Sequence, residues 1–148
     1  MSKLSKKSAW RAPDEYGRSL TGLSVNLLVK DVESSLEFHR QVLGATELYS
    51  DVDFAAFQFG DVGWMLHADH TYDAHPLYRT LQHGSARGIG AEIRLHGRDP
   101  DTAQATAQLL GYEGLQVSTD KPHGVREVFL VDPDGYLWVP DVPLSPDN

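Results

Sequence analysis

The chain of 148 residues contains no cysteine, which excludes disulfide bonds, cysteine nucleophiles and thiolate metal sites. It also lacks any apolar run close to the roughly 20 residues that a membrane-spanning helix needs. Its basic beginning, "MSKLSKKSAW", is not followed by the apolar segment of a secretory signal. We therefore expect a cytoplasmic protein with no membrane partner.

Positive charge is scarce. Lys and Arg number 13 against 21 Asp and Glu, which gives a net charge of −8. This balance disfavours nucleic acid as a partner and favours cationic or neutral ligands. The length fits one domain over residues 21–142, with a tail over 143–148. A polar, flexible extension over 1–20 is expected to fray or to lie over a neighbouring part rather than to join the core.

The domain contains an internal repeat. The segments "LSVNLLVKDVESSLEFHRQVLGATE" and "AEIRLHGRDPDTAQATAQLLGYE" each contain an alternating strand, an acid, a helical stretch and a Leu-Gly stop. Asp31 matches Asp99 at an offset of 99 − 31 = 68, and Gly44 matches Gly111 at an offset of 111 − 44 = 67. The acids are expected to cap the two helices and the glycines to end them.

Turn-rich strands follow each helix, with tight turns at Gly60-Asp61 and at "DPDG", residues 132–135. Each repeat is therefore predicted to be one strand, one helix and about three further strands. The modules span 21–70 and 90–142, and residues 71–89 form a His-rich linker with a short helix near 77–82. This order predicts an α+β fold of two βαβββ modules.

The order of elements, with "VKDVESSLEFHRQVLG" and "GVREVFLVDPDGYLW", resembles the vicinal oxygen chelate superfamily. That superfamily includes glyoxalase I, extradiol dioxygenases, fosfomycin-resistance proteins and bleomycin-resistance proteins, and the "GVREVF" run looks most like the bleomycin-resistance branch. The resemblance implies curved mixed sheets that enclose a cavity, and commonly a homodimer.

The resemblance also implies where catalytic relatives hold one divalent metal ion, on the first and last strands of each module. The matching positions here are Ser24, Met65, Glu92 and Val139. Of these, only Glu92 is a competent donor for such an ion. Even if His67 replaced Met65, the set would fall short of the usual three protein ligands. We therefore expect no metal cofactor, and the alternative is one divalent ion held by non-standard ligands.

The cavity of such a fold would be lined from the open faces of the strands. Nine residues are predicted to bind a ligand there: Asn26, Gln58, Met65, His67, Glu92, Arg94, Glu127, Phe129 and Val139. His70 and His75 are interpreted as ordinary histidines of the rim, and Trp64 and Trp138 as core residues packed against the helices. Trp10 is expected to anchor the extension to the rim or to a partner subunit.

We interpret the chain as a metal-free protein that binds a small cationic or aromatic molecule, in the manner of sequestration, and acts as a homodimer. One alternative is an enzyme: a metal-dependent lyase, isomerase or dioxygenase that uses His67, Glu92 and a third donor from His70 or the partner chain. Another is a non-catalytic interaction domain with a vestigial pocket.

Overall fold

The two sequence repeats form two four-stranded mixed sheets in the computed structural model, which describes residues 10–83 and 86–146. The first module contains β1 (Val25–Val29), α2 (Val32–Glu37), a π-helix η3 (Phe38–Val42), β2 (Thr46–Ser50), β3 (Phe54–Phe59) and β4 (Val62–Ala68). The second contains β5 (Ile93–His96), α4 (Pro100–Leu110), β6 (Gly114–Asp120), β7 (Val125–Val131) and β8 (Leu137–Pro143). The predicted α+β class and the two βαβββ modules are confirmed.

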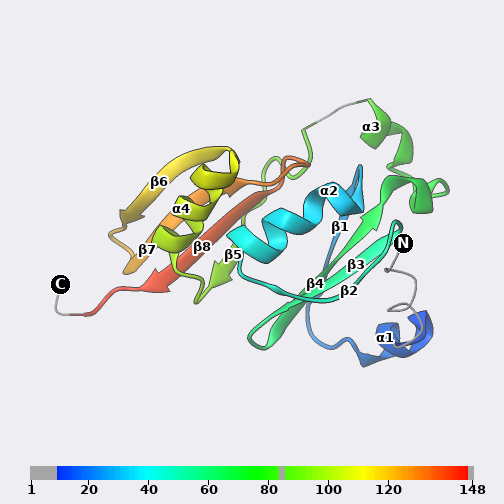
Figure 1. The fold of residues 1–148 in the computed structure, drawn as a ribbon, viewed down its shortest axis with the longest axis horizontal. Coiled ribbons are helices and arrows are strands. Elements are labelled where there is room, and N and C mark those ends of the chain that lie inside the picture. Colours follow the sequence, from blue (N-terminus) through cyan, green and yellow to red (C-terminus); the bar gives the residue numbers. More distant parts are fainter. Residues whose placement is uncertain (1–9, 84–85, 147–148) are drawn as a thin grey trace.

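The sheets have the same topology, with orders β1-β4-β3-β2 and β5-β8-β7-β6. In each, the first strand runs parallel to the last, and the other pairs are antiparallel. The two sheets lie side by side (Figure 1), and neither closes on itself. Helix α1 (Pro13–Ser19) precedes them, and η4 (Asp69–Tyr72) and α3 (Tyr78–Gln82) lie in the linker. In the described part of the chain, no helix is long and apolar enough to cross a membrane.

The helix ends follow the sequence signals. Asp31 accepts a hydrogen bond from the backbone N–H of Ser34 at 3.2 Å, and Asp99 accepts one from Thr102 at 2.8 Å. Gly111 ends α4 in the left-handed conformation, with φ of 83°. A side chain at that position would be strained, so the Leu-Gly pattern marks the helix end for a steric reason.

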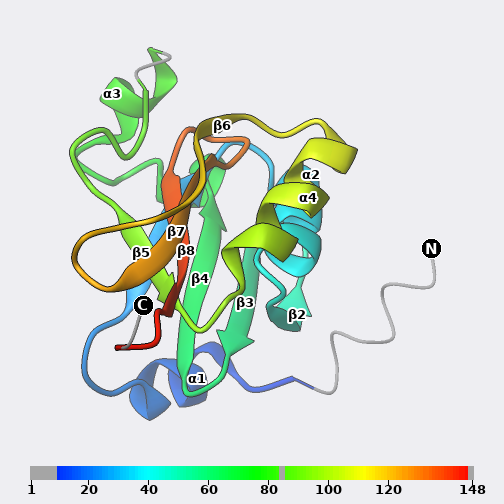
Figure 2. The ribbon, with the colours of Figure 1, turned by 90° about the vertical axis from the view of Figure 1, so that its left-hand side faces the viewer.

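Helices α2 and α4 cover the same side of the two sheets, and the core lies between helices and strands (Figure 2). Trp64 and Trp138, each almost fully buried, meet there with ring centroids 5.1 Å apart. Both tryptophans therefore belong to the helix-packed core, as predicted. They join the two modules into one hydrophobic cluster.

His39 lies fully buried among these rings. The Trp64 Nε1–H donates to His39 Nδ1 at 3.0 Å, and the Phe57 ring stacks on the imidazole at 4.8 Å. Burial lowers the pKa of His39 to about 3, so the ring is neutral at physiological pH. The spacing of Leu36, His39, Val42 and Leu43 puts these residues on one side of a helix, but it gives no sign that Trp64 is the partner of His39.

The predicted "DPDG" turn joins the modules. Asp134 accepts from the backbone N–H of Lys30 at 2.8 Å and from the Ser35 hydroxyl at 3.1 Å, both in the first module. Asp132 accepts from Trp138 Nε1–H at 3.1 Å, and burial raises the pKa of Asp132 to about 6. Asp134 thus fixes the turn of the second module onto the start of α2, and Asp132 stabilises the turn from within its own module.

Candidate functional site

The first sheet has one face against the helices and one open face. Along β4, Trp64, Leu66 and Ala68 are buried in the core, whereas Met65 and His67 are only partly buried and line a cavity on the opposite side. This alternation follows from the two-residue period of a strand. Met65 and His67 therefore form the floor of a site on the open face.

A bulge in β2 adds an aromatic ring to this face. The ladder pairs Glu47 with Phe57 and Tyr49 with Ala56, so Leu48 is the extra residue. Without the bulge, Leu48 would take the place of Tyr49 opposite Ala56, and Tyr49 would turn toward the helices. The insertion of one residue thus places a phenol, rather than an exposed aliphatic side chain, in the site.

The N-terminal segment covers the open face. Trp10 stacks on Tyr49 with ring centroids 4.7 Å apart and planes 13° apart, and it lies 5.6 Å from Phe54. Tyr16 of α1 packs edge-on against Phe54 at 5.9 Å. Residues 10–20 therefore lie over the first sheet, which is the second of the two placements expected for the extension, while residues 1–9 are outside the described part. The signal in the sequence was the three- and four-residue spacing of Trp10, Pro13, Tyr16 and Leu20, which all line the cavity described next.

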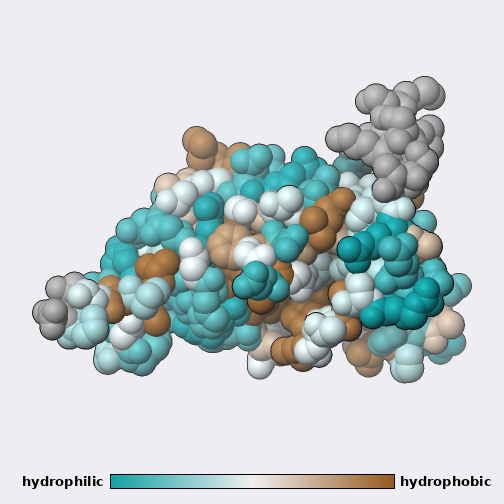
Figure 3. All heavy atoms as spheres, turned by 90° about the horizontal axis from the view of Figure 1, so that it is seen from below, coloured by the Kyte–Doolittle hydropathy of each residue, from teal (hydrophilic) through white to brown (hydrophobic). Residues whose placement is uncertain are grey.

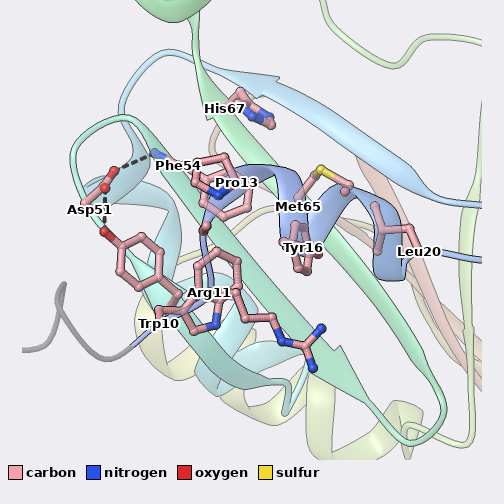
Figure 4. Close-up of a pocket in the computed structure, with 12 residues that line it drawn as sticks. Trp10, Arg11, Pro13, Tyr16, Leu20, Asp51, Phe54, Met65 and His67 are labelled. Atoms are coloured by element: carbon pink, nitrogen blue, oxygen red, sulfur yellow. Dashed lines mark hydrogen bonds between the residues drawn. The ribbon is translucent and has the colours of Figure 1, made fainter.

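Between this segment and the sheet lies a cavity of about 590 Å³ (Figure 4). Figure 4 shows residues of the N-terminal segment and of β2, β3 and β4 around the same space. Its lining is mainly aromatic and aliphatic: Trp10, Arg11, Ala12, Pro13, Tyr16, Gly17, Leu20, Tyr49, Asp51, Phe54, Met65 and His67. Viewed from below, hydrophobic residues gather near the middle of the molecule, between hydrophilic surfaces at its two ends (Figure 3).

The cavity carries little net charge. Burial raises the pKa of Tyr49 to about 12, together with a 2.7 Å hydrogen bond to Asp51, and burial also raises the pKa of Tyr16. Both phenols therefore remain neutral. Arg11 contributes one positive charge and Asp51 one negative charge, and Asp51 already accepts from the backbone N–H groups of Asp53 and Phe54.

His67 is the one imidazole among the lining residues, and its orientation is fixed from behind. Its Nδ1 lies 2.6 Å from the side-chain oxygen of Asn26, whose amide nitrogen donates to the Tyr72 hydroxyl at 3.0 Å. An amide oxygen only accepts, so the Nδ1 of His67 carries the proton. Burial lowers the pKa of His67, which favours the neutral ring and leaves Nε2 as an acceptor.

The open face of the second sheet has a different chemistry. Arg94 donates to Glu127, to Glu92 at 3.0 Å and to Asp141 at 3.2 Å. The side chains of Glu127 and Asp141 are only 4% and 3% exposed. Burial alone would raise the pKa of Glu127, but the hydrogen bond and charge of Arg94 outweigh it and hold that pKa below its ordinary value. This face is occupied by ion pairs.

The nine predicted ligand-binding residues thus fall into two groups on two sheets. Met65 and His67 line the cavity, and Asn26 acts behind His67. Gln58 donates to the carbonyl of Gly60 in its own hairpin. The members on the second sheet do not line this cavity: Glu92, Arg94 and Glu127 form the ion-pair network, Phe129 is partly buried and Val139 is fully buried. Sequence reasoning missed Trp10, Tyr16, Tyr49 and Phe54 as cavity residues.

The other histidines of the linker have separate partners. His70 Nε2 lies 2.6 Å from Asp53, and His75 Nδ1 accepts from the backbone N–H of Leu77 at 3.1 Å. Within residues 10–83 and 86–146, no group of three or more His, Cys, Asp or Glu side chains could hold a metal ion.

The residues at the metal positions of catalytic relatives also do not suit a divalent ion. The ladders pair Asn26 with Met65 and Arg94 with Val139, so Met65 and Val139 occupy equivalent places in the two modules. A thioether and an aliphatic side chain are poor ligands for such an ion. Glu92, the single competent donor, is already bound to Arg94.

Comparison with known proteins agrees with the fold. A structure of a glyoxalase/bleomycin resistance protein/dioxygenase from Nocardioides is 21% identical, with a TM-score of 0.60 over 90% of this chain and 93% of that one. A glyoxalase-related enzyme from Fulvimarina pelagi is 16% identical, with a TM-score of 0.65 over 86% and 94% of the two chains. The genomically encoded fosfomycin resistance protein FosX of Listeria monocytogenes is 18% identical, with a TM-score of 0.60 over 83% and 93%.

No curated protein matches the sequence. The narrower likeness to the bleomycin-resistance branch stays a prediction. The model of the Glyoxalase/Bleomycin resistance protein/Dioxygenase superfamily matches residues 23–139, which include both modules from β1 to the middle of β8. The chain therefore belongs to the glyoxalase/bleomycin resistance protein/dioxygenase superfamily.

Proposed function

We propose that this protein binds a planar aromatic small molecule, without a metal ion, in the cavity between the N-terminal segment and the first sheet. The observation that carries the proposal is the set of four aromatic side chains around one space: Trp10, Tyr16, Tyr49 and Phe54. Rings of this kind stack on a flat ligand and bury much apolar surface at a low cost in conformational entropy. The volume of about 590 Å³ is in the ordinary range for a small-molecule site.

The charge balance refines the class of ligand. Although the chain has a net charge of −8, the cavity itself contains Arg11 beside Asp51 and two neutral phenols. A cationic ligand would meet Arg11 without gaining an unpartnered carboxylate. The proposal therefore favours a neutral aromatic ligand over a cationic one. The protein would sequester this ligand without changing it chemically.

A metal-dependent lyase or dioxygenase is the competing function. Its ligand set would need His67 and Glu92 together, but Glu92 lies in the other module, directly before β5, and accepts a hydrogen bond from Arg94. No observation on the described residues favours that function over binding. We also propose that the protein is a homodimer, because the family resemblance implies one. Light scattering after size-exclusion chromatography would measure the oligomeric state.

A fluorescence titration tests the proposal. Protein dialysed against EDTA is titrated with 2-methoxynaphthalene, a neutral aromatic compound, and with a naphthalene that carries a trimethylammonium group. We expect saturable binding of the neutral compound at one site per chain and weaker binding of the cation. A Phe54→Leu variant, which removes a ring but keeps apolar bulk, should bind the neutral compound about fivefold more weakly, as expected for one aromatic pair.

Two outcomes would contradict the proposal. One is the absence of binding by either compound, which would support a vestigial pocket. The other is binding that requires added zinc, nickel, manganese or iron, which would support a metal-dependent function. A Leu115→Ala variant is the control, because Leu115 is 59% exposed on β6 and far from the lining residues in sequence and sheet.

A further inference from the structure

His67 is a polar group of defined direction in a cavity whose lining is mainly aromatic and aliphatic. Its ring lies 4.9 Å from Phe54 and 5.1 Å from Tyr72 by centroid distance, so two aromatic side chains from β3 and η4 restrict its rotation. Its Nδ1 is held by Asn26 of β1 at 2.6 Å. Three elements therefore fix a single side chain whose remaining nitrogen is not used in any hydrogen bond recorded for the described residues.

The hydrogen-bond directions determine which nitrogen is the acceptor. The amide nitrogen of Asn26 donates to the Tyr72 hydroxyl at 3.0 Å, and the amide oxygen faces His67 Nδ1 at 2.6 Å. Because that oxygen has no proton to give, the imidazole proton resides on Nδ1 and the lone pair on Nε2. The chain Tyr72–Asn26–His67 thus selects one tautomer, as a second layer of side chains does in many binding sites.

The charged and titratable groups around the ring do not disturb this state. Arg11, Tyr16, Tyr49 and Asp51 line the same cavity, and Tyr72 lies behind the ring. The Tyr49 phenol donates to Asp51 at 2.7 Å, so this carboxylate has its own donor. The nearby pair of His70 and Asp53 is exposed and closed on itself at 2.6 Å. Burial also favours the neutral imidazole, because it lowers the pKa of His67.

We infer that the ligand is an aromatic compound with a hydroxyl or N–H group on its ring, and that His67 Nε2 accepts the hydrogen bond from that group. This inference rests on the proposed function and names the class of ligand within it. An acceptor in a partly buried site that is left without a donor loses free energy, so a ligand without the donor group is discriminated against. The aromatic walls supply affinity, and His67 supplies selection.

A matched pair of compounds tests this inference. 2-Naphthol and 2-methoxynaphthalene share the same rings and differ in one methyl group, which removes the donor. We expect the wild-type protein to bind 2-naphthol about fivefold more tightly, the size of one net hydrogen bond. In a His67→Phe variant, which keeps a flat ring of similar size, both compounds should bind with equal affinity.

The second readout is the tautomer itself. Nitrogen-15 spectra of histidine-labelled protein should show the proton of His67 on Nδ1 in the wild type, and loss of that preference in an Asn26→Ala variant. The Asn26→Ala variant should also show a smaller ratio between the two compounds. A His96→Gln variant, altered on the second sheet, is the control and should keep both the ratio and the His67 spectrum.

The outcomes separate the inference from the proposed function. If both compounds bind with equal affinity to the wild type, or if the proton lies on Nε2, the inference is overturned while aromatic binding stands. If neither compound binds, the proposed function itself fails. If the ratio persists in His67→Phe, another group recognises the hydroxyl and the assignment of His67 is wrong.

Discussion

The two modules share a ladder but not the chemistry of their open faces. Asn26 pairs with Met65 in the first sheet as Arg94 pairs with Val139 in the second, and His67 occupies the place of Asp141. In each module, the side chain from the first strand contacts a side chain from the last strand: Asn26 contacts His67, and Arg94 contacts Asp141. In the first module this contact is a neutral hydrogen bond, and in the second it is an ion pair.

The difference shows how one scaffold separates binding from stability. In the second module, Arg94 and its three carboxylate partners occupy the space over the strands, so each group of the network satisfies another. In the first module, the neutral pair uses little space, and the N-terminal segment closes over it to leave a cavity. We expect substitutions on the second face to change stability and substitutions on the first to change binding.

The largest effect is expected for Arg94→Met. This change leaves Glu127 and Asp141 buried without their cation, which should lower the free energy of unfolding by about 3 kcal/mol. Urea unfolding measures the loss. The matched variant Asn26→Leu, at the equivalent position of the first module, should lose only about 1 kcal/mol. Equal losses at the two positions would break the comparison.

Acid should act in opposite directions on the two modules. His39 has a pKa of about 3 in the folded state, below its ordinary value near 6.5, so its contribution is present at neutral pH and is lost as pH falls. Asp132 has a pKa of about 6, above its ordinary value near 3.8, so its contribution grows as pH falls through 6.

The directions of these two pKa shifts predict how the difference in the free energy of unfolding between the wild type and each of two variants changes with pH. From pH 7 to pH 5 the stability advantage of the wild type over His39→Gln should shrink by about 2 kcal/mol. Over the same interval its advantage over Asp132→Asn should grow by about 1 kcal/mol. Constant differences across this interval would show that neither group titrates as its burial implies.

Removal of the Trp10 ring should weaken binding without much effect on the fold. Trp10→Ala loses the stacking contact with Tyr49 and opens one wall of the cavity, so affinity for 2-naphthol should fall about tenfold. The free energy of unfolding should change by less than about 1 kcal/mol, because Trp10 is only partly buried and the α1 helix that follows it has no buried residue. A Leu23→Ala variant, altered at a residue that is 92% exposed, should leave affinity unchanged. A large loss of stability in Trp10→Ala would make the segment part of the core instead.

The smallest effect is expected at His70. Its pair with Asp53 is 62% and 56% exposed, and such pairs contribute little in water. His70→Ala should therefore change the free energy of unfolding by less than about 0.5 kcal/mol and leave the affinity for 2-naphthol unaltered. A loss of binding in this variant would extend the site into the linker.

The fold could be predicted because its signals are local. Asp31 and Asp99 cap helices, Gly111 ends one, and "DPDG" closes a hairpin, and each of these acts within a few residues. The alternation in β4 likewise assigned Trp64 to the core and Met65 to the open face. Such patterns do not depend on how the modules pack.

The site could be predicted only in part, because its walls are brought together by long-range packing. Tyr49 reaches the cavity through a bulge at Leu48, and no periodicity marks an inserted residue. Trp10 reaches it because a segment that looked polar and terminal folds back over β3. Arg94 was predicted to line the pocket because of its strand position. Instead, its guanidinium is held in ion pairs with buried carboxylates from β7 and β8.

Amide chemical-shift mapping of the metal-free protein shows directly whether 2-naphthol binds between the N-terminal segment and the first sheet. Saturating 2-naphthol should shift the amide signals of the N-terminal segment, of β3 and of β4 around His67, and should leave those around Arg94 and Asp141 unchanged. Shifts confined to β5, β7 and β8, or shifts that appear only after a divalent metal ion is added, would contradict metal-free binding at that site.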